Sequence, residues 1–147
     1  MARSNETLNM KRAYYYFFYK IYKSIEYTSE AMGGKFWSKG KAGISVVVLE
    51  LWLLFSILNY YDIINNSKQK LDLTSPVIFI PLLIIIILNY VIFDHYDSVW
   101  EKYKKEFDIL SKRKNIIGGI IVWAVILLIT VNFFVSTHYF YKTFFTK

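Results

Sequence analysis

Only one short segment of this 147-residue chain brings histidine and carboxylate side chains together. It reads Asp94-His95-Tyr96-Asp97, and its spacing fits neither a metal-ligand set nor an acid–base pair. A charged, solvated helix end explains the same residues. We therefore expect no metal site and no catalytic residue in this segment.

The common enzyme signatures are missing from the sequence. There is no glycine-rich phosphate loop and no G-x-S-x-G nucleophile motif. Ser136-Thr137-His138 has no carboxylate nearby and marks the polar end of an apolar segment. The absence of cysteine excludes disulfides, thiolate metal sites and palmitoylation. These patterns predict a protein that is not an enzyme and that uses no cofactor.

Glu50 is the residue whose insertion into a bilayer would cost the most free energy, because it lies about eight residues into an apolar segment. A central acidic group costs on the order of 3 kcal/mol to insert into a bilayer, so Glu50 should be protonated, paired, or turned toward protein or water. One hypothesis makes it a proton or cation site, or the lining of a pore. The simpler one makes it a neutral hydrogen-bonding residue that fixes helix packing, with Asn132, Thr130 or Asn89 as partner.

A milder polar stripe lies on a different face of the same segment and includes Trp52. Two polar faces on one segment indicate that protein contacts it on two sides, which places it at the centre of a helix bundle. The predicted intramembrane polar residues are Glu50, Asn59, Asn89, Asn132, Ser45 and Ser56.

The segments that must position these residues are apolar and long. The chain is 55% hydrophobic and 20% aromatic, and its apolar runs cover residues 43–64, 76–93 and 116–136. Each is close to the roughly 20 residues that cross a hydrocarbon core of about 30 Å. The composition predicts an all-α integral membrane protein with three transmembrane helices, joined by an external loop at 65–75 and followed by an external aromatic tail at 137–147.

The basic residues indicate the orientation of these spans. Segment 1–42 carries eight of the 18 Lys and Arg residues and segment 94–115 carries six, whereas the other connection and the tail carry two each. Because cytoplasmic segments are enriched in Lys and Arg, we expect a cytoplasmic N-terminus and an external C-terminus. The predicted location is the bacterial inner (plasma) membrane.

Residues 11–28 have the pattern of a basic, aromatic amphipathic helix. At about 100° per residue, one side gathers an aromatic and aliphatic stripe, and the other side gathers cations. This pattern favours a helix in the inner headgroup layer, although the same stripe is compatible with packing against the other cytoplasmic segment. The stripe consists of Tyr14, Phe17, Phe18, Ile21, Tyr22 and Ile25, and the predicted lipid-surface residues are Arg12, Lys20, Lys23, Phe17, Phe18 and Trp37.

The second cytoplasmic segment, 94–115, shows alternating spacings of three and four between its large apolar residues. This is the pattern of a helix packed along a narrow seam, and no Pro or Gly separates it from the second span. We expect one continuous helix over about 76–110, with Asn115 as the N-cap of the third span. The seam's partner is helix 11–28, a second copy or another protein, and the first is the simplest. The predicted seam residues are Tyr96, Trp100, Tyr103, Phe107 and Leu110.

Two functional hypotheses remain. The first is a small multipass protein that acts through protein–protein interaction, as an accessory subunit or an immunity-type protein. The alternative is a homo-oligomeric channel or membrane-perturbing effector in which Glu50 lines a polar path. The expected partners are the lipid bilayer and either another membrane protein or copies of the chain itself. No nucleic acid is expected, because the aromatic rings of segment 11–28 lie away from its cations.

Overall fold

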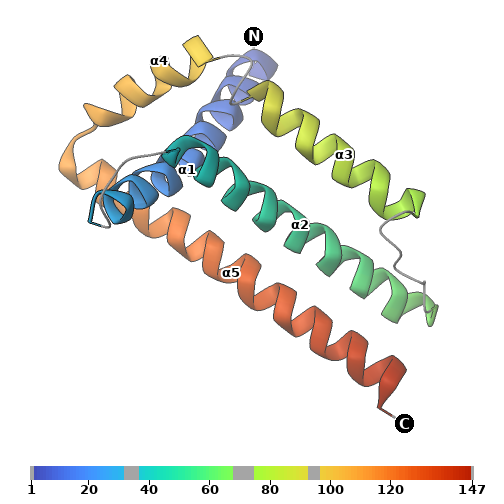
Figure 1. The fold of residues 1–147 in the computed structure, drawn as a ribbon. Coiled ribbons are helices and arrows are strands. Elements are labelled where there is room, and N and C mark those ends of the chain that lie inside the picture. Colours follow the sequence, from blue (N-terminus) through green and yellow to red (C-terminus); the bar gives the residue numbers. More distant parts are fainter. Residues whose placement is uncertain (1, 32–36, 68–74, 93–96, 147) are drawn as a thin grey trace. The chain divides into compact units, whose positions relative to one another are not determined.

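The computed structural model of the chain describes residues 2–31, 37–67, 75–92 and 97–146. The described part is entirely helical and contains no strand, which confirms the predicted all-α class. Its helices are α1 (Ala2–Ala31), α2 (Ser38–Asn65), α3 (Pro76–Tyr90), α4 (Asp97–Asp108) and α5 (Lys112–Phe145), as Figure 1 shows.

Local sequence fixes both ends of α2. Trp37 precedes the helix with φ 58°, and its carbonyl accepts the backbone hydrogen bond of Lys41 at 3.0 Å. At the other end Asn66 has φ 47°, the left-handed conformation that often terminates helices. The amide of Ser67 donates to the carbonyl of Asp62 at 3.0 Å, which satisfies a carbonyl that the helix itself leaves free.

The beginning of α3 follows the preference for serine before a helix and proline at its first position. The carbonyl of Ser75 accepts the amides of Ile78 and Phe79 at 3.0 and 2.9 Å, and Pro76 needs no amide partner there.

The described residues form two helices within the region for which the sequence predicted one continuous helix over 76–110, and residues 93–96 between them lie outside the described part. Helix α3 ends at Tyr90 and a wider helical turn follows at 91–92, while α4 begins at Asp97. The carbonyl of Ile92 accepts a 2.8 Å hydrogen bond from the Tyr15 hydroxyl of α1. A side chain of α1 therefore contacts the carbonyl at the end of this wider turn.

Helix α5 is longer than the apolar segment from which it was predicted. It begins at Lys112 rather than at residue 116, and the carbonyl that accepts the Asn115 amide is that of Ser111. The expected N-cap at Asn115 is therefore wrong by about one turn. The helix also continues through most of the aromatic tail, to Phe145.

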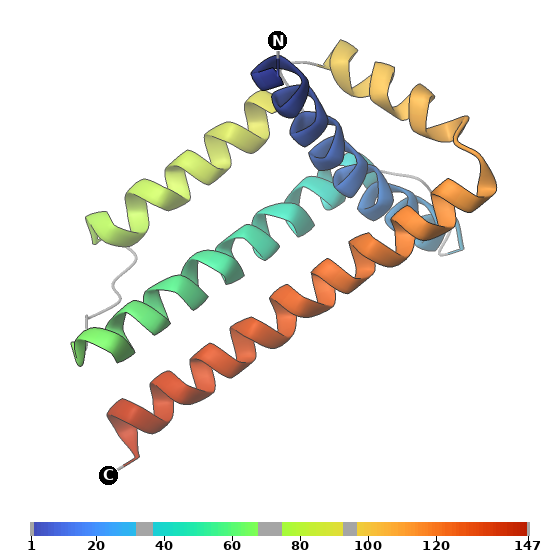
Figure 2. The same ribbon diagram turned by 180° about the vertical axis from the view of Figure 1, so that it is seen from behind.

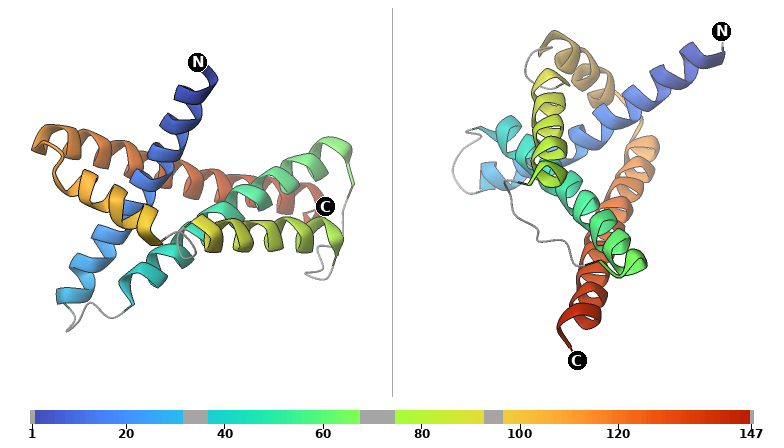
Figure 3. Two further views of the ribbon diagram at one scale, coloured as in Figure 1. Left: turned by 90° about the horizontal axis from the view of Figure 1, so that it is seen from above. Right: turned by 90° about the vertical axis from the view of Figure 1, so that its right-hand side faces the viewer.

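The chain forms two compact units. Unit 1 comprises Met1–Val46 and Asn89–Trp123, and unit 2 comprises Val47–Leu88 and Ala124–Lys147. In unit 1, α1 and α4 make the most extensive helix–helix contact of the described chain, and α1 crosses the first turns of α5 (Figure 3). In unit 2, the second part of α2 lies between α3 and α5 (Figures 1 and 2).

Helices α2 and α5 are each long and apolar enough to cross a membrane. Their apolar windows are only 28% and 11% buried, whereas a core helix of a water-soluble protein is mostly buried. Large side chains such as Leu127 and Leu128 are about two-thirds exposed. These features suggest, although weakly, that the protein is associated with a membrane.

Candidate functional site

The aromatic interface between α1 and α4 forms the core of unit 1. The indole ring of Trp100 lies edge-on to Phe18, with ring centroids 4.8 Å apart, and it also meets Tyr22 at 5.5 Å. Phe18 and Trp100 are each only 1% exposed. Edge-to-face pairs of this kind stabilise beyond the area that they bury, so this contact fixes α4 on α1.

The same interface continues toward the end of α4. Tyr103 stacks on Tyr15 at 4.6 Å, and Phe107 lies edge-on to Tyr16 at 5.1 Å. The predicted seam thus contacts α1 through three of its residues, Trp100, Tyr103 and Phe107. Of the seam's remaining positions, Leu110 is half-buried and Tyr96 lies outside the described residues.

The buried face of α1 differs from the stripe predicted from its sequence. Tyr15 and Tyr19 are 1% and 4% exposed, although neither belongs to the predicted stripe, whereas Phe17 is only half-buried. Residues 14–19 are all aromatic. Periodicity therefore cannot select one face of this helix, and packing against α4 selects it instead.

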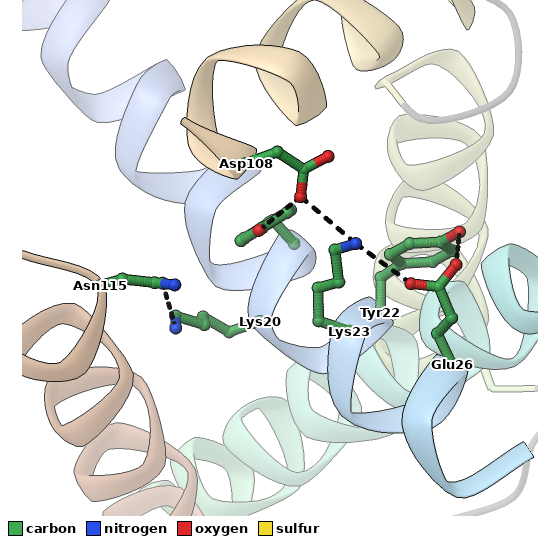
Figure 4. A network of polar contacts seen from close by, with 7 residues as sticks. Lys20, Tyr22, Lys23, Glu26, Asp108 and Asn115 are labelled. Carbon is green, nitrogen blue, oxygen red and sulfur yellow. Dashed lines mark hydrogen bonds and ion pairs between the residues drawn. The ribbon is translucent and has the colours of Figure 1, made fainter. Parts of the chain in front are cut away.

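A polar network borders the aromatic core, as Figure 4 shows. The Tyr19 hydroxyl donates to the Asp108 carboxylate at 2.8 Å, and the Lys23 ammonium pairs with the same carboxylate at 3.2 Å. Lys23 also pairs with Glu26 at 3.2 Å, and the Tyr22 hydroxyl donates to Glu26 at 2.8 Å. These contacts join the middle of α1 to the end of α4.

Burial and the carboxylates shift the ionisation of this network. Desolvation, the hydrogen bond to Glu26 and the charge of that carboxylate raise the pKa of Tyr22 to about 12. Desolvation lowers the pKa of Lys23, but its hydrogen bonds to Glu26 and Asp108 outweigh that effect and raise the pKa overall. Lys23 is therefore held as a cation within the network.

A second polar contact joins α1 to the start of α5. The Lys20 ammonium donates to the side-chain oxygen of Asn115, and the Tyr16 hydroxyl lies 3.3 Å from the backbone and side-chain oxygens of the same residue. Burial lowers the pKa of Lys20. Gly118 permits this approach, because an added Cβ would lie 2.4 Å from the Tyr16 hydroxyl.

The residues predicted for the lipid surface are largely engaged with protein. Phe18, Lys20 and Lys23 make the contacts described above, and Arg12 forms an ion pair with Glu106 at 2.6 Å. Trp37 is 61% exposed, beside the beginning of α2. A Cβ on Gly40 would overlap the indole ring of Trp37, so the absence of a side chain at position 40 leaves room for that ring.

An open hollow of about 290 Å³ lies in unit 1, beside the close approach of Tyr16 to Gly118. It is bounded by α1, by the connection that follows α4 and by the first turns of α5. Its walls are partly apolar and partly basic. The lining includes Asn9, Arg12, Tyr16, Phe107, Lys114 and Gly118.

Unit 2 contains a set of neutral polar contacts between α2 and α5. The buried amide of Asn59 donates to the hydroxyls of Ser136 and Thr137, both at 3.3 Å. Nearby, the Tyr60 hydroxyl donates to the side-chain oxygen of Asn132 at 3.1 Å. The ring of Trp52 stacks on Phe133 with centroids 5.2 Å apart.

The other predicted intramembrane residues have different surroundings. Ser45 and Ser56 donate to carbonyls of their own helix, those of Lys41 and Trp52, at 3.0 and 2.8 Å. The buried Asn89 accepts a hydrogen bond from Tyr14 at 3.3 Å, and Glu50 is half-buried. Of the partners suggested for Glu50, Asn132 is hydrogen-bonded to Tyr60, and the hydroxyl of Thr130 is hydrogen-bonded to the Ile126 carbonyl.

Sequence reasoning did not identify Asp108 or Glu26 as parts of the polar network, or Lys114 as part of the hollow's lining. Helical spacing offered a signal only for the contacts of Glu26 with Tyr22 and Lys23, which lie about one turn away on α1. The segment Asp94-His95-Tyr96 lies outside the described residues. No family model, curated protein or solved structure matches this chain.

Proposed function

We propose that this chain is a small, non-enzymatic, multipass protein of the bacterial inner membrane that acts by binding another membrane protein. It crosses the bilayer three times through α2, α3 and α5, with the N-terminus in the cytoplasm and the C-terminus outside. The α1–α4 interface then forms a compact cytoplasmic layer. An accessory subunit or an immunity-type protein fits this description.

The spans are supported by length and exposure. Helices α2 and α5 exceed the roughly 20 residues that a span needs. Helix α3 has 15 residues, about 22 Å at 1.5 Å per residue, and the helical turn at 91–92 extends it. Its side chains Ile84, Ile86 and Ile87 are about half exposed, which is favourable in lipid.

The position of Glu50 carries the proposed protein–protein interaction. Trp52 and Asn59 contact α5, and Asn59 lies nine residues after Glu50, which is about 180° around a helix of 100° per residue. Glu50 therefore lies on the face of α2 turned away from α5, where it is half-buried. Glu50 makes an interaction within the chain but stays partly exposed. Because an exposed carboxyl group at mid-membrane is costly in lipid, a protein partner that covers this face lowers that cost.

The same face of α2 offers apolar side chains to such a partner. Ile57 and Tyr61 lie within about 20° of Glu50 on this helix, and they are 63% and 53% exposed. A transmembrane helix that packs here gains van der Waals contact from these residues and a hydrogen bond from Glu50.

Site-specific crosslinking in native membranes tests this interface, and the absence of native cysteine makes single-cysteine variants clean probes. Ile57→Cys, carrying a photoactivatable thiol reagent, should yield one crosslinked adduct. The mass added in that adduct should not be a multiple of the mass of this chain. Leu127→Cys on α5, equally exposed at 65%, is the matched control and should yield none. Glu50→Leu should abolish the adduct at position 57, whereas Glu50→Gln should retain it, because glutamine preserves the hydrogen bond.

Two outcomes would contradict the proposal. Adducts at position 57 whose masses are multiples of the mass of this chain, together with an ion flux that Glu50→Gln abolishes, would favour the homo-oligomeric channel instead. Equal crosslinking from positions 57 and 127 would show that the Glu50 face has no specific partner.

A further inference from the structure

The hollow between α1 and α5 contains two basic side chains that the proposed function does not use. Asn9, Arg12 and Tyr16 reach it from successive turns of α1, and Lys114 and Gly118 reach it from one face of α5. Its volume, about 290 Å³, is at the lower end of the range for small-ligand sites. We propose that this hollow binds the phosphate group of an anionic phospholipid.

The charges of the hollow favour an anion. Lys114 is exposed, and no acidic side chain of the described residues lies within ion-pair distance of it. Arg12 pairs with Glu106 through one terminal nitrogen, and its side chain remains 50% exposed. Because a guanidinium has five N–H donors, this single contact leaves donors for a phosphate oxygen.

The backbone at the start of α5 adds to this positive field. Lys112 and Arg113 occupy the same first turn as Lys114, and neither has an ion-pair partner among the described residues. Unpaired amides at a helix N-terminus also attract negative charge. Lys114 lines the hollow itself, and the two neighbouring cations add to the positive potential at this end of α5.

An apolar surface that begins at the hollow identifies a lipid as the source of the phosphate. Ile117 and Ile121 follow Lys114 and Gly118 by three residues each, so they continue the same side of α5. They are 49% and 58% exposed. A headgroup held by Arg12 and Lys114 would place its acyl chains against these isoleucines, which matches the basic pockets that hold anionic lipids beside membrane helices.

This assignment rests on the proposed membrane placement of α5, but its test needs no protein partner. The full chain, purified in mild detergent, is titrated with phosphatidylglycerol, phosphatidylcholine or inorganic phosphate. Native mass spectrometry counts the lipid or phosphate molecules that remain bound. We expect one tightly retained phosphatidylglycerol and no equivalent retention of phosphatidylcholine. Lys114→Gln should weaken retention about fivefold, and adding Arg12→Gln should weaken it by about the same factor again.

Matched variants separate a built site from general surface charge. Lys142→Gln removes an exposed cation near the other end of α5 and should leave retention unchanged. Lys114→Arg preserves the charge and should preserve retention, which distinguishes loss of binding from loss of folding. The crosslink from position 57 should persist in Lys114→Gln. This result distinguishes loss of the lipid site from loss of the partner interface.

Three results would overturn the assignment. Equal retention in the wild-type chain and the double variant would show that the hollow does not hold the lipid. Equal losses in Lys114→Gln and Lys142→Gln would indicate nonspecific attraction. Binding of inorganic phosphate as tight as that of phosphatidylglycerol, with competition between the two, would assign the hollow to free phosphate.

Discussion

The indole of Trp100 lies edge-on to Phe18 at a centroid distance of 4.8 Å, and this pair links α4 to α1 across 82 residues of sequence. Because both side chains are fully buried, Trp100→Ala should leave a cavity and cost about 3–5 kcal/mol of unfolding free energy. Thermal unfolding in detergent, followed by circular dichroism, measures this loss. Glu101→Ala, at the exposed neighbouring position, should change stability little, and equal stability of both variants would contradict the packing described.

The Tyr19–Asp108 hydrogen bond should appear as a coupling energy between the two residues. Because Asp108 is partly exposed, we expect a coupling of only about 1 kcal/mol in a double-mutant cycle of Tyr19→Phe and Asp108→Asn. The measurement is chemical denaturation of the four proteins. Tyr27→Phe, at an exposed position of α1, should show no coupling to Asp108→Asn.

Two helical glycines should respond in opposite ways to alanine. Gly43→Ala should stabilise the protein by up to about 1 kcal/mol, because nothing lies within 4 Å of the added Cβ. Gly118→Ala should instead destabilise it by about 1 kcal/mol or more, because the Cβ would displace the Tyr16 ring and its contacts with Asn115. The melting temperatures of the two variants test this, and a shared direction would contradict the close approach of α1 to α5.

Alkaline pH should weaken the polar network at Tyr22. Its pKa is raised from 10.0 to about 12, so the folded protein holds a proton that the unfolded chain has already lost in this interval. The contribution of Tyr22 to stability is therefore complete below pH 10.0 and is lost as the pH rises to about 12. Tyr22→Phe should flatten this part of the stability profile, measured by thermal unfolding at successive pH values, and Tyr27→Phe should leave it unchanged.

The predicted topology places the two ends of the chain on opposite sides of the membrane. In intact cells, a membrane-impermeant thiol reagent should label Thr146→Cys but not Asn9→Cys, and permeabilised cells should show both labelled. Labelling of both positions, or of neither, in intact cells would indicate an even number of spans. That result would remove α3 from the membrane.

The sequence determined the helical class because that class depends on local properties. Apolar runs of about span length, the Ser75-Pro76 start of α3 and the three-and-four spacing of α4 are each readable within one segment. The same local rules located α2 to within a few residues of its observed bounds.

The wider helical turn that follows α3 at 91–92 was not predictable in this way. No Pro or Gly separates the two helices, and local propensity favours one helix across the whole region. The Tyr15 hydroxyl bonds to the carbonyl of Ile92 across 77 residues, and such a contact is invisible to any pattern within the segment.

The sequence by itself thus determined the helices, their apolar lengths and the charge of their connections, because transfer free energy and periodicity act along a local stretch of chain. Only the tertiary structure decided which face of α1 is buried and which groups its lysines bind. Lys20 bonds to Asn115, 95 residues away, and Lys23 pairs with Asp108. The physical reason is that residues 14–19 of α1 are all aromatic, so packing and hydrogen bonding with distant segments, rather than the helix's own pattern, selected its partners.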